Sequence, residues 1–130
     1  MENEILKGRK ILIVEDDLSS RLYLNKILEK TGVILYNAGD GQEAIDIVMK
    51  NPDIDVILMD IQLPVMDGYK SAERIREFRK DIIIIAQTAY GLMGDKEKIL
   101  DSGFNDYVIK PIFAQVLIEK LVANIARKIS

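Results

Sequence analysis

DVILMD, residues 55–60, contains a run of four apolar residues and ends in a carboxylate. An uninterrupted apolar run predicts a strand that is buried on both faces, as in a parallel sheet. Pro64 and Gly68 stop the strand in the segment that follows, and Asp67 is placed to cap a helix. Asp60 is therefore expected at the carboxyl edge of the sheet, where open α/β folds bind their ligands.

The rest of the chain alternates between apolar runs and helical patterns. We expect strands at residues 10–14, 33–38, 55–60, 82–87 and 106–109, and helices at 18–30, 40–50, 67–78, 92–102 and 112–129. This alternation predicts an α/β domain with a parallel sheet and helices on both faces. The fourth helix has a thin apolar stripe and is predicted to be loosely packed and mobile. One domain is expected over residues 1–130, with its core from residue 10 to residue 129 and no output domain.

Composition excludes several classes of protein. The chain has 130 residues, 48% of them apolar and 30% charged, which is ordinary for one globular domain. Its net charge of −3 and its lack of a basic tail argue against direct nucleic-acid binding. With no Cys and no His, disulfides, thiolate chemistry and the usual zinc ligands are excluded. Neither a membrane span nor a signal peptide is recognisable, so we expect a cytoplasmic protein without membrane contact.

Chemically useful side chains stand at the ends of four predicted strands. They are Glu15 and Asp16 after the first strand, Asp60 on the third, Thr88 on the fourth and Lys110 on the fifth. Parallel strands bring these ends to one edge, so three carboxylates meet if the first and third strands are neighbours. Two charges about 5 Å apart repel by roughly 3 kcal/mol at an effective dielectric constant of about 20, so the cluster requires a proton or a cation. Oxygen ligands alone favour Mg²⁺ or Mn²⁺ over Zn²⁺.

Each of these residues also has a simpler explanation when it is considered alone. Glu15 and Asp16 could cap a helix, Thr88 could be a turn hydroxyl, and Lys110 could form a surface ion pair. Asp60 is equally compatible with a helix cap and with a nucleophile. Their joint placement at one predicted edge favours a pocket for a single phosphoryl group.

Four motifs at these strand ends resemble the receiver (response-regulator) domain of two-component phosphorelay systems over nearly the whole chain. The motifs are ILIVEDD at residues 11–17, LMDIQLPVMDG at 58–68, QTAY at 87–90 and NDYVIKP at 105–111. The resemblance implies a flavodoxin-like (βα)5 three-layer sandwich, with a five-stranded parallel sheet of order 2-1-3-4-5. The last two motifs are similar to receivers of hybrid histidine kinases. A stand-alone receiver and a receiver cut from a larger protein both fit the chain.

The resemblance also implies roles for the residues at the predicted edge. Asp60 matches the phosphoacceptor, and Lys110 matches the lysine that pairs with it and then with the phosphoryl group. Mg²⁺, with Mn²⁺ as an alternative, would be held by Glu15, Asp16, Asp60 and the backbone carbonyl of Gln62. No other cofactor is implied.

Two further residues match the family's switch. Thr88 corresponds to the hydroxyl that bonds the phosphoryl group, and Tyr107 to the aromatic residue whose rotation accompanies it. By the same resemblance, Gln62 and Tyr90 are expected to flank the pocket, at positions that in this family influence the lifetime of the acyl phosphate. The bond between Lys110 and Pro111 is expected to be cis.

The implied function is a phosphorylation-activated signalling switch rather than an enzyme, although it assists its own phosphorylation and dephosphorylation. The donor would be a phosphohistidine of a histidine kinase or a histidine phosphotransfer protein. A downstream protein would read the surface of the fourth helix, fifth strand and last helix. A monomer or a phosphorylation-dependent dimer is expected.

Two other functions start from the same features. A phosphatase of the haloacid dehalogenase type would need an acid two residues after the nucleophile, where this chain has Gln62, and a cap domain. A flavin-binding module would need a phosphate-cradling loop after the first strand. Residues 15–17 are acidic instead and would repel a phosphate unless a metal intervenes.

Overall fold

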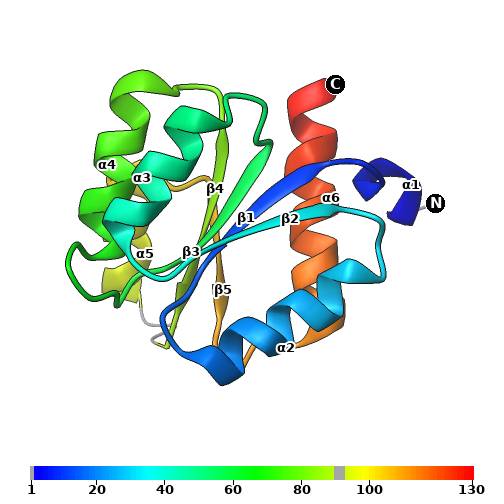
Figure 1. Ribbon diagram of the computed structural model, residues 1–130, viewed down its shortest axis with the longest axis horizontal. Coiled ribbons are helices and arrows are strands. Elements are labelled where there is room, and N and C mark those ends of the chain that lie inside the picture. Colours follow the sequence, from blue (N-terminus) through cyan, green and yellow to red (C-terminus); the bar gives the residue numbers. More distant parts are fainter. Residues whose placement is uncertain (1, 90–92) are drawn as a thin grey trace.

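Five parallel strands form the centre of the molecule (Figure 1). This computed structural model describes residues 2–89 and 93–130. The strands are β1 (Lys10–Val14), β2 (Ile34–Ala38), β3 (Val56–Asp60), β4 (Ile83–Thr88) and β5 (Asp106–Ile109). They lie in the order β2-β1-β3-β4-β5, and each neighbouring pair is parallel. The predicted flavodoxin-like α/β architecture and its strand order are confirmed.

The described part of the chain forms six helices, which cover both faces of the sheet (Figure 1). They are α1 (Glu2–Leu6), α2 (Leu18–Glu29), α3 (Gly41–Lys50), α4 (Gly68–Phe78), α5 (Met93–Asp101) and α6 (Ala114–Ile129). Helices α3, α4 and α5 pack on one face, and α1, α2 and α6 pack on the other. Within the described residues no helix combines the length and hydropathy that crossing a membrane would require.

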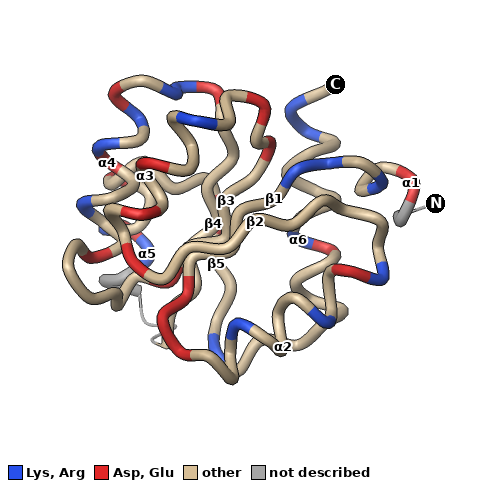
Figure 2. The backbone as a smooth tube through the Cα atoms, in the orientation of Figure 1, with Lys and Arg blue, Asp and Glu red and all other residues tan. Residues whose placement is uncertain are grey.

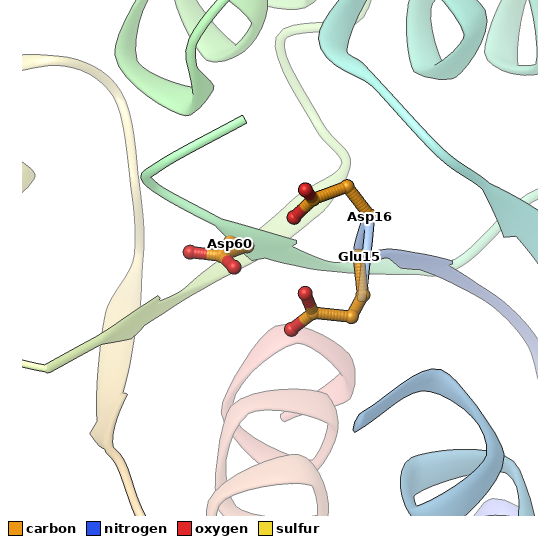
Figure 3. Close-up of side chains that lie close together, drawn as sticks. All are labelled: Glu15, Asp16 and Asp60. Atoms are coloured by element: carbon orange, nitrogen blue, oxygen red, sulfur yellow. The ribbon is translucent and has the colours of Figure 1, made fainter. Parts of the chain in front are cut away.

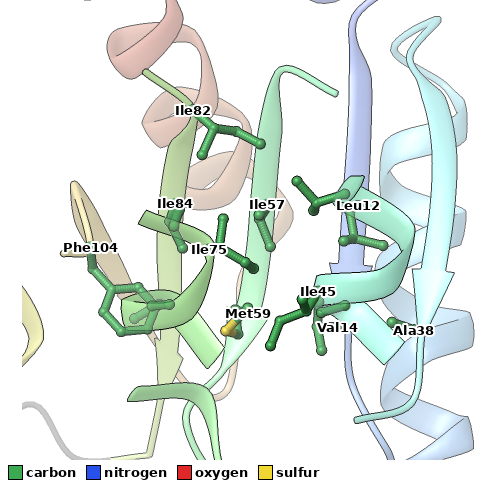
Figure 4. Close-up of a cluster of buried hydrophobic side chains, with 14 of the residues drawn as sticks. Leu12, Val14, Ala38, Ile45, Ile57, Met59, Ile75, Ile82, Ile84 and Phe104 are labelled. Atoms are coloured by element: carbon green, nitrogen blue, oxygen red, sulfur yellow. The ribbon is translucent and has the colours of Figure 1, made fainter. Parts of the chain in front are cut away.

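Two hydrophobic clusters hold the helices to the sheet, because successive strand residues point to opposite faces. Figure 4 shows the cluster beneath α3 and α4, where Ile57 and Met59 of β3 meet Ile75 of α4. The opposite cluster takes the intervening residues of the same strands, such as Leu58. All five residues of β3 are buried, so the apolar run of residues 56–59 is the doubly covered strand that the sequence predicted.

Three aspartates cap the helices that follow the strand ends. Asp17 accepts a hydrogen bond from the amide of Ser20 at the start of α2, and Asp40 begins α3 in the same way. Asp67 caps α4 by accepting from the amide of Lys70 at 2.9 Å. Since Asp67 fills this position, Asp60 is not the cap of the next helix.

The N-terminal segment differs from the prediction, because α1 precedes the first strand and the core was expected to begin only at residue 10. Leu6 at its end is fully buried in the cluster beneath α2 and α6. The side chain of Arg9 donates to the carbonyl of Ile5 at 2.9 Å and fixes the turn after the helix. Five residues are too few to show a helical period, so the hydrophobic pattern could not reveal this element. The core therefore begins before residue 10.

The predicted fourth helix corresponds to α5, and its expected start at Leu92 lies outside the described residues. Ile99 is buried against the sheet, whereas the neighbouring apolar residue Leu100 is 46% exposed. Of residues 96–101, Ile99 alone is buried, so the thin apolar stripe is confirmed for this part of the helix. The mobility of this helix stays a prediction.

Candidate functional site

The register of the sheet brings the predicted site residues to one edge. Val14 of β1 pairs with Met59 of β3, so Glu15 stands level with Asp60 on the neighbouring strand. Asp60 in turn pairs with Gln87, and Thr88 pairs with Ile109, the residue before Lys110. Figure 2 shows the acidic segment that follows β1 at this edge.

Three carboxylates meet where β1 and β3 end (Figure 3). One oxygen of each of Glu15, Asp16 and Asp60 lies within 4.8 Å of the others. Glu15 and Asp60 are 1% and 5% exposed, whereas Asp16 is exposed to solvent. Three carboxylate oxygens on one open side fit a hard divalent cation such as Mg²⁺, which keeps several of its waters. The predicted acidic cluster is confirmed.

Both oxygens of Asp60 have a defined partner. The ammonium of Lys110 lies 2.8 Å from Oδ2, and the backbone amide of Gln62 donates to Oδ1 at 3.0 Å. The same ammonium lies 3.3 Å from Oε1 of Glu15, while the amide of Asp17 donates to Oε2 of that carboxylate. Lys110 therefore bridges the two buried acids.

The electrostatics of the site follow from burial and from this bridge. Burial by itself would lower the pKa of the Lys110 ammonium, but the hydrogen bond and charge of Asp60, with help from Glu15, raise that pKa overall. Burial also raises the pKa of the Glu15 carboxyl, and the nearby charge of Asp60 raises it further. The hydrogen bond from the amide of Asp17 lowers this pKa but does not reverse the overall rise. Lys110 is thus held in its charged form between the two acids.

Backbone contacts fix the loop that carries Asp60. The amide of Ile61 donates to the carbonyl of Gln87 at 3.2 Å, and the amide of Gly68 donates to the carbonyl of Ile61 at 2.8 Å. A Cβ atom on Gly68 would lie 2.4 Å from the carbonyl oxygen of Asp60, so only glycine allows the loop to return this close. The start of α4 is therefore packed directly against the backbone of Asp60.

A cavity of about 580 Å³ opens beside these carboxylates, and Asp16, Asp60, Thr88 and Lys110 lie on its wall. Thr88 is buried at the end of β4, and its carbonyl accepts from the amide of Lys110 at 2.7 Å. The peptide bond between Lys110 and Pro111 is cis, as predicted. Gln62 also lines this cavity, and the expected role of its backbone carbonyl as a metal ligand stays a prediction.

Tyr107 lies away from the carboxylates. It is half-buried on β5, opposite Ala86, and it is not among the described residues of the cavity wall. Its ring centroid is 5.3 Å from the ammonium of Lys120, which also pairs with Asp106 at 2.9 Å. The contacts show what surrounds Tyr107, and its role as a switch stays a prediction. Tyr90, expected to flank the pocket, lies outside the described residues.

Gln87 and Lys98 lie on the cavity wall and were not among the predicted site residues. Gln87 is fully buried, its amide nitrogen donates to the carbonyl of Leu58 at 3.3 Å, and its Oε1 has no partner within the described part of the chain. A polar residue at the end of the apolar run 82–86 was the available signal. Lys98 reaches the wall from α5, and no local pattern could have placed it there.

The sequence comparisons agree with this geometry. The response regulator receiver domain family matches residues 11–122 of the chain. Hybrid signal transduction histidine kinase I from Dictyostelium discoideum is 40% identical over 129 residues, which cover 93% of this chain but only 7% of that kinase. The chain thus spans a small part of the length of this curated relative.

Solved structures give the same result. A similar chain occurs in the Saccharomyces cerevisiae co-crystal structure of the histidine phosphotransfer protein Ypd1 and the receiver domain of Ssk1. It matches with a TM-score of 0.84 and 35% sequence identity, and the match covers 88% of this chain and 87% of that chain. A chain of the CheX-CheY-BeF3-Mg+2 complex from Borrelia burgdorferi matches with a TM-score of 0.89 and 25% identity over 95% of this chain and 98% of that one. On its fold, its acidic edge and these matches, the chain belongs to the response regulator receiver domain family.

Proposed function

We propose that this receiver domain accepts a phosphoryl group on the carboxylate of Asp60 and changes its surface in response. The observation that carries the proposal is the setting of this carboxylate: it is almost fully buried, paired with Lys110, and within 4.8 Å of two further acids beside an open cavity. A carboxylate that served only as a surface charge or helix cap would need none of these contacts.

The residues around Asp60 suit phosphoryl transfer, which depends mainly on positioning and charge neutralisation. Glu15, Asp16 and Asp60 would hold Mg²⁺ or Mn²⁺, which when bound offsets the negative charge of the acids and the incoming phosphoryl group. The amide of Gln62 and the ammonium of Lys110 orient the Asp60 carboxylate. Lys110 would then pair with a phosphoryl oxygen on that carboxylate, and Thr88 would donate its hydroxyl to the phosphoryl group. Through these residues the domain would assist its own phosphorylation and dephosphorylation.

A phosphohistidine of a kinase or of a phosphotransfer protein is the proposed donor. The 130 residues contain no histidine, so the donor group lies outside them. Exposed apolar side chains beside the site offer a docking surface, namely Leu18 and Leu22 of α2 and Phe113 after β5. Tyr23 of α2 donates to the carbonyl of Ile112 at 2.7 Å, so these two segments adjoin. The likeness to a hybrid kinase and to a receiver solved with a phosphotransfer protein supports this proposal.

The proposed output surface is formed by α5, β5 and α6. A groove of about 350 Å³ on this side is lined by Tyr107, Ile109, Val116 and Lys120, among others. Its apolar rim is exposed, with Ile109 46% and Val116 43% accessible. Rotation of Tyr107 would change both the groove and its contact with Lys120, and a downstream protein would read the difference.

Phosphorylation by a small donor tests the proposal. Acetyl phosphate with Mg²⁺ is expected to add one phosphoryl group per chain in intact-mass measurements, and Asp60→Asn is expected to abolish the addition. Phosphorylation that survives Asp60→Asn would contradict the assignment. Steady release of phosphate from many small esters would instead favour a phosphatase, for which Gln62 lacks the carboxyl of a general acid.

A further inference from the structure

The cavity beside Asp60 has a second cation on its wall. Besides the site residues, the wall includes Tyr69 from the first turn of α4 and Lys98 from α5. The volume of about 580 Å³ falls in the range of roughly 300–1,000 Å³ that small-molecule sites occupy. The cavity therefore has room for a phosphorylated small molecule, with Lys98 among the residues that would surround it.

Lys98 is held by an aromatic ring instead of an acid. Its Nζ atom lies 4.3 Å from the ring centroid of Tyr69. Tyr69 meets Phe104 edge-on, with 6.2 Å between the ring centroids and 88° between the planes, so the ring that supports the ammonium is itself packed. No salt bridge to Lys98 occurs among the side chains that the structure describes. A cation–π contact positions the charge of an ammonium without neutralising it.

The two cations on the cavity wall thus differ in whether they already pair with an acid. Lys110 already pairs with Asp60 and Glu15, whereas Lys98 keeps an uncompensated charge toward the described residues around it. An anion that enters or forms in the cavity would meet Lys98 as its available cation.

The chemistry of phosphoryl transfer produces such an anion. As an oxygen of Asp60 forms its bond to phosphorus, the bond to the leaving group breaks in line with it, and the leaving group departs away from Asp60 with the electron pair. From an acyl phosphate the leaving group is a carboxylate anion, so one carboxylate is consumed and one is released. From phosphoramidate the leaving nitrogen carries its protons away and departs as neutral ammonia.

We propose that Lys98 is a specificity residue of this site, whose ammonium receives the carboxylate released when Asp60 takes a phosphoryl group from a small acyl phosphate. The inference rests on the proposed role of Asp60 as phosphoacceptor. It assigns to Lys98 a part in distinguishing small donors by the charge of their leaving group.

The test compares two donors on matched lysine variants. Phosphorylation rates with acetyl phosphate and with phosphoramidate are measured by intact mass, in Mg²⁺, for wild type, Lys98→Gln, Lys98→Arg and Lys96→Gln. Lys96 is exposed on the same helix and is not on the described cavity wall, so it controls for net charge. Lys98→Gln is expected to slow the reaction with acetyl phosphate about three- to fivefold, the size of a solvent-exposed ion pair. The rate of Lys98→Gln with phosphoramidate is expected to equal that of wild type. Lys98→Arg is expected to keep the wild-type rate with both donors, and so is Lys96→Gln.

Other outcomes overturn the inference. An equal loss of rate with both donors would mean that Lys98 acts on the phosphoryl group or on the structure, and no loss with acetyl phosphate would remove its role altogether. Mg²⁺ affinities of the four proteins, measured by calorimetry, are expected to agree and so exclude a disturbed acidic cluster. A wild-type chain phosphorylated by neither donor would contradict the proposed function as well, whereas normal phosphorylation that Lys98→Gln leaves unchanged contradicts only the role of Lys98.

Discussion

The ammonium of Lys110 lies 2.8 Å from Oδ2 of Asp60, and this ion pair joins the ends of two strands that are separated by β4. The lysine side chain crosses β4 to reach the carboxylate, and it contacts Glu15 of β1 as well. One flexible cation thus offsets part of the repulsion among the acids. The same cation is within reach of any group that becomes attached to Asp60.

Replacing Lys110 by Met is predicted to strengthen Mg²⁺ binding and to slow phosphorylation. Loss of the cation removes a competitor for the acids, so Mg²⁺ should bind more tightly by about 1 kcal/mol. Phosphorylation by acetyl phosphate should become slower by about 100-fold, as for other preorganised donors that stabilise a transition state. Calorimetric Mg²⁺ titration and intact-mass kinetics measure the two effects. Lys26→Met, an exposed change on α2, is the control, and weaker Mg²⁺ binding in Lys110→Met would contradict the account.

Gly68→Ala is predicted to damage the site through the backbone of Asp60. The new Cβ would lie 2.4 Å from the carbonyl oxygen of Asp60 and 2.8 Å from Cα of Ile61, so the loop or α4 must move. We expect a loss of about 1–3 kcal/mol in the free energy of unfolding and slower phosphorylation. Gly39→Ala is the matched control, since its Cβ would meet only a side-chain atom of Arg21 at 3.4 Å. Equal stabilities of the two variants in urea unfolding would refute the packing argument.

Asp106 is predicted to make stability depend on pH. Burial raises the pKa of its carboxyl, but hydrogen bonds from Lys120, Asn124 and the amide of Tyr107 outweigh burial and lower the pKa overall. Because the unfolded chain binds this proton more readily, the contribution of Asp106 is complete above its ordinary pKa of about 3.9 and is lost as the pH falls through the lower folded value.

Asp106→Asn should therefore lower the free energy of unfolding by about 1–2 kcal/mol at neutral pH. The difference from wild type should shrink when urea unfolding is repeated at acid pH, as the pH falls through the lowered pKa of Asp106 and its carboxyl gains a proton in the folded protein. Asp101→Asn, at an exposed position, should change the stability little at either pH. A difference for Asp106→Asn that is the same at both pH values would show that its charge is not involved.

The sheet and the acidic edge could be predicted because both depend on local patterns and one topological rule. The apolar run 56–59 identifies β3, and parallel order then brings Glu15, Asp60 and Lys110 together without any knowledge of the loops. Asp67 as the cap of α4 follows from its place before Gly68. These residues met as predicted because each one is adjacent in sequence to the element that positions it.

The features that could not be predicted depend on contacts between distant segments. Leu6 is buried only because α1 packs beside α6, and a five-residue helix carries no period that would show this. Lys98 lies on the cavity wall with its ammonium over the ring of Tyr69, which belongs to a different helix, and no pattern local to α5 shows this contact. Gln87 could be placed at the end of a predicted strand, but its hydrogen bond to the carbonyl of Leu58 on the neighbouring strand depends on the packed structure.

The most direct test of the account maps the phosphorylated residue itself. After reaction with acetyl phosphate and Mg²⁺, borohydride reduces an acyl phosphate of aspartate to homoserine, which peptide mass spectrometry locates. The account predicts a single homoserine at position 60, and none when Mg²⁺ is removed by a chelator. Homoserine at Asp16 or Asp17, or a reduction-resistant phosphate on Thr88, would contradict the claim that Asp60 is the phosphoacceptor.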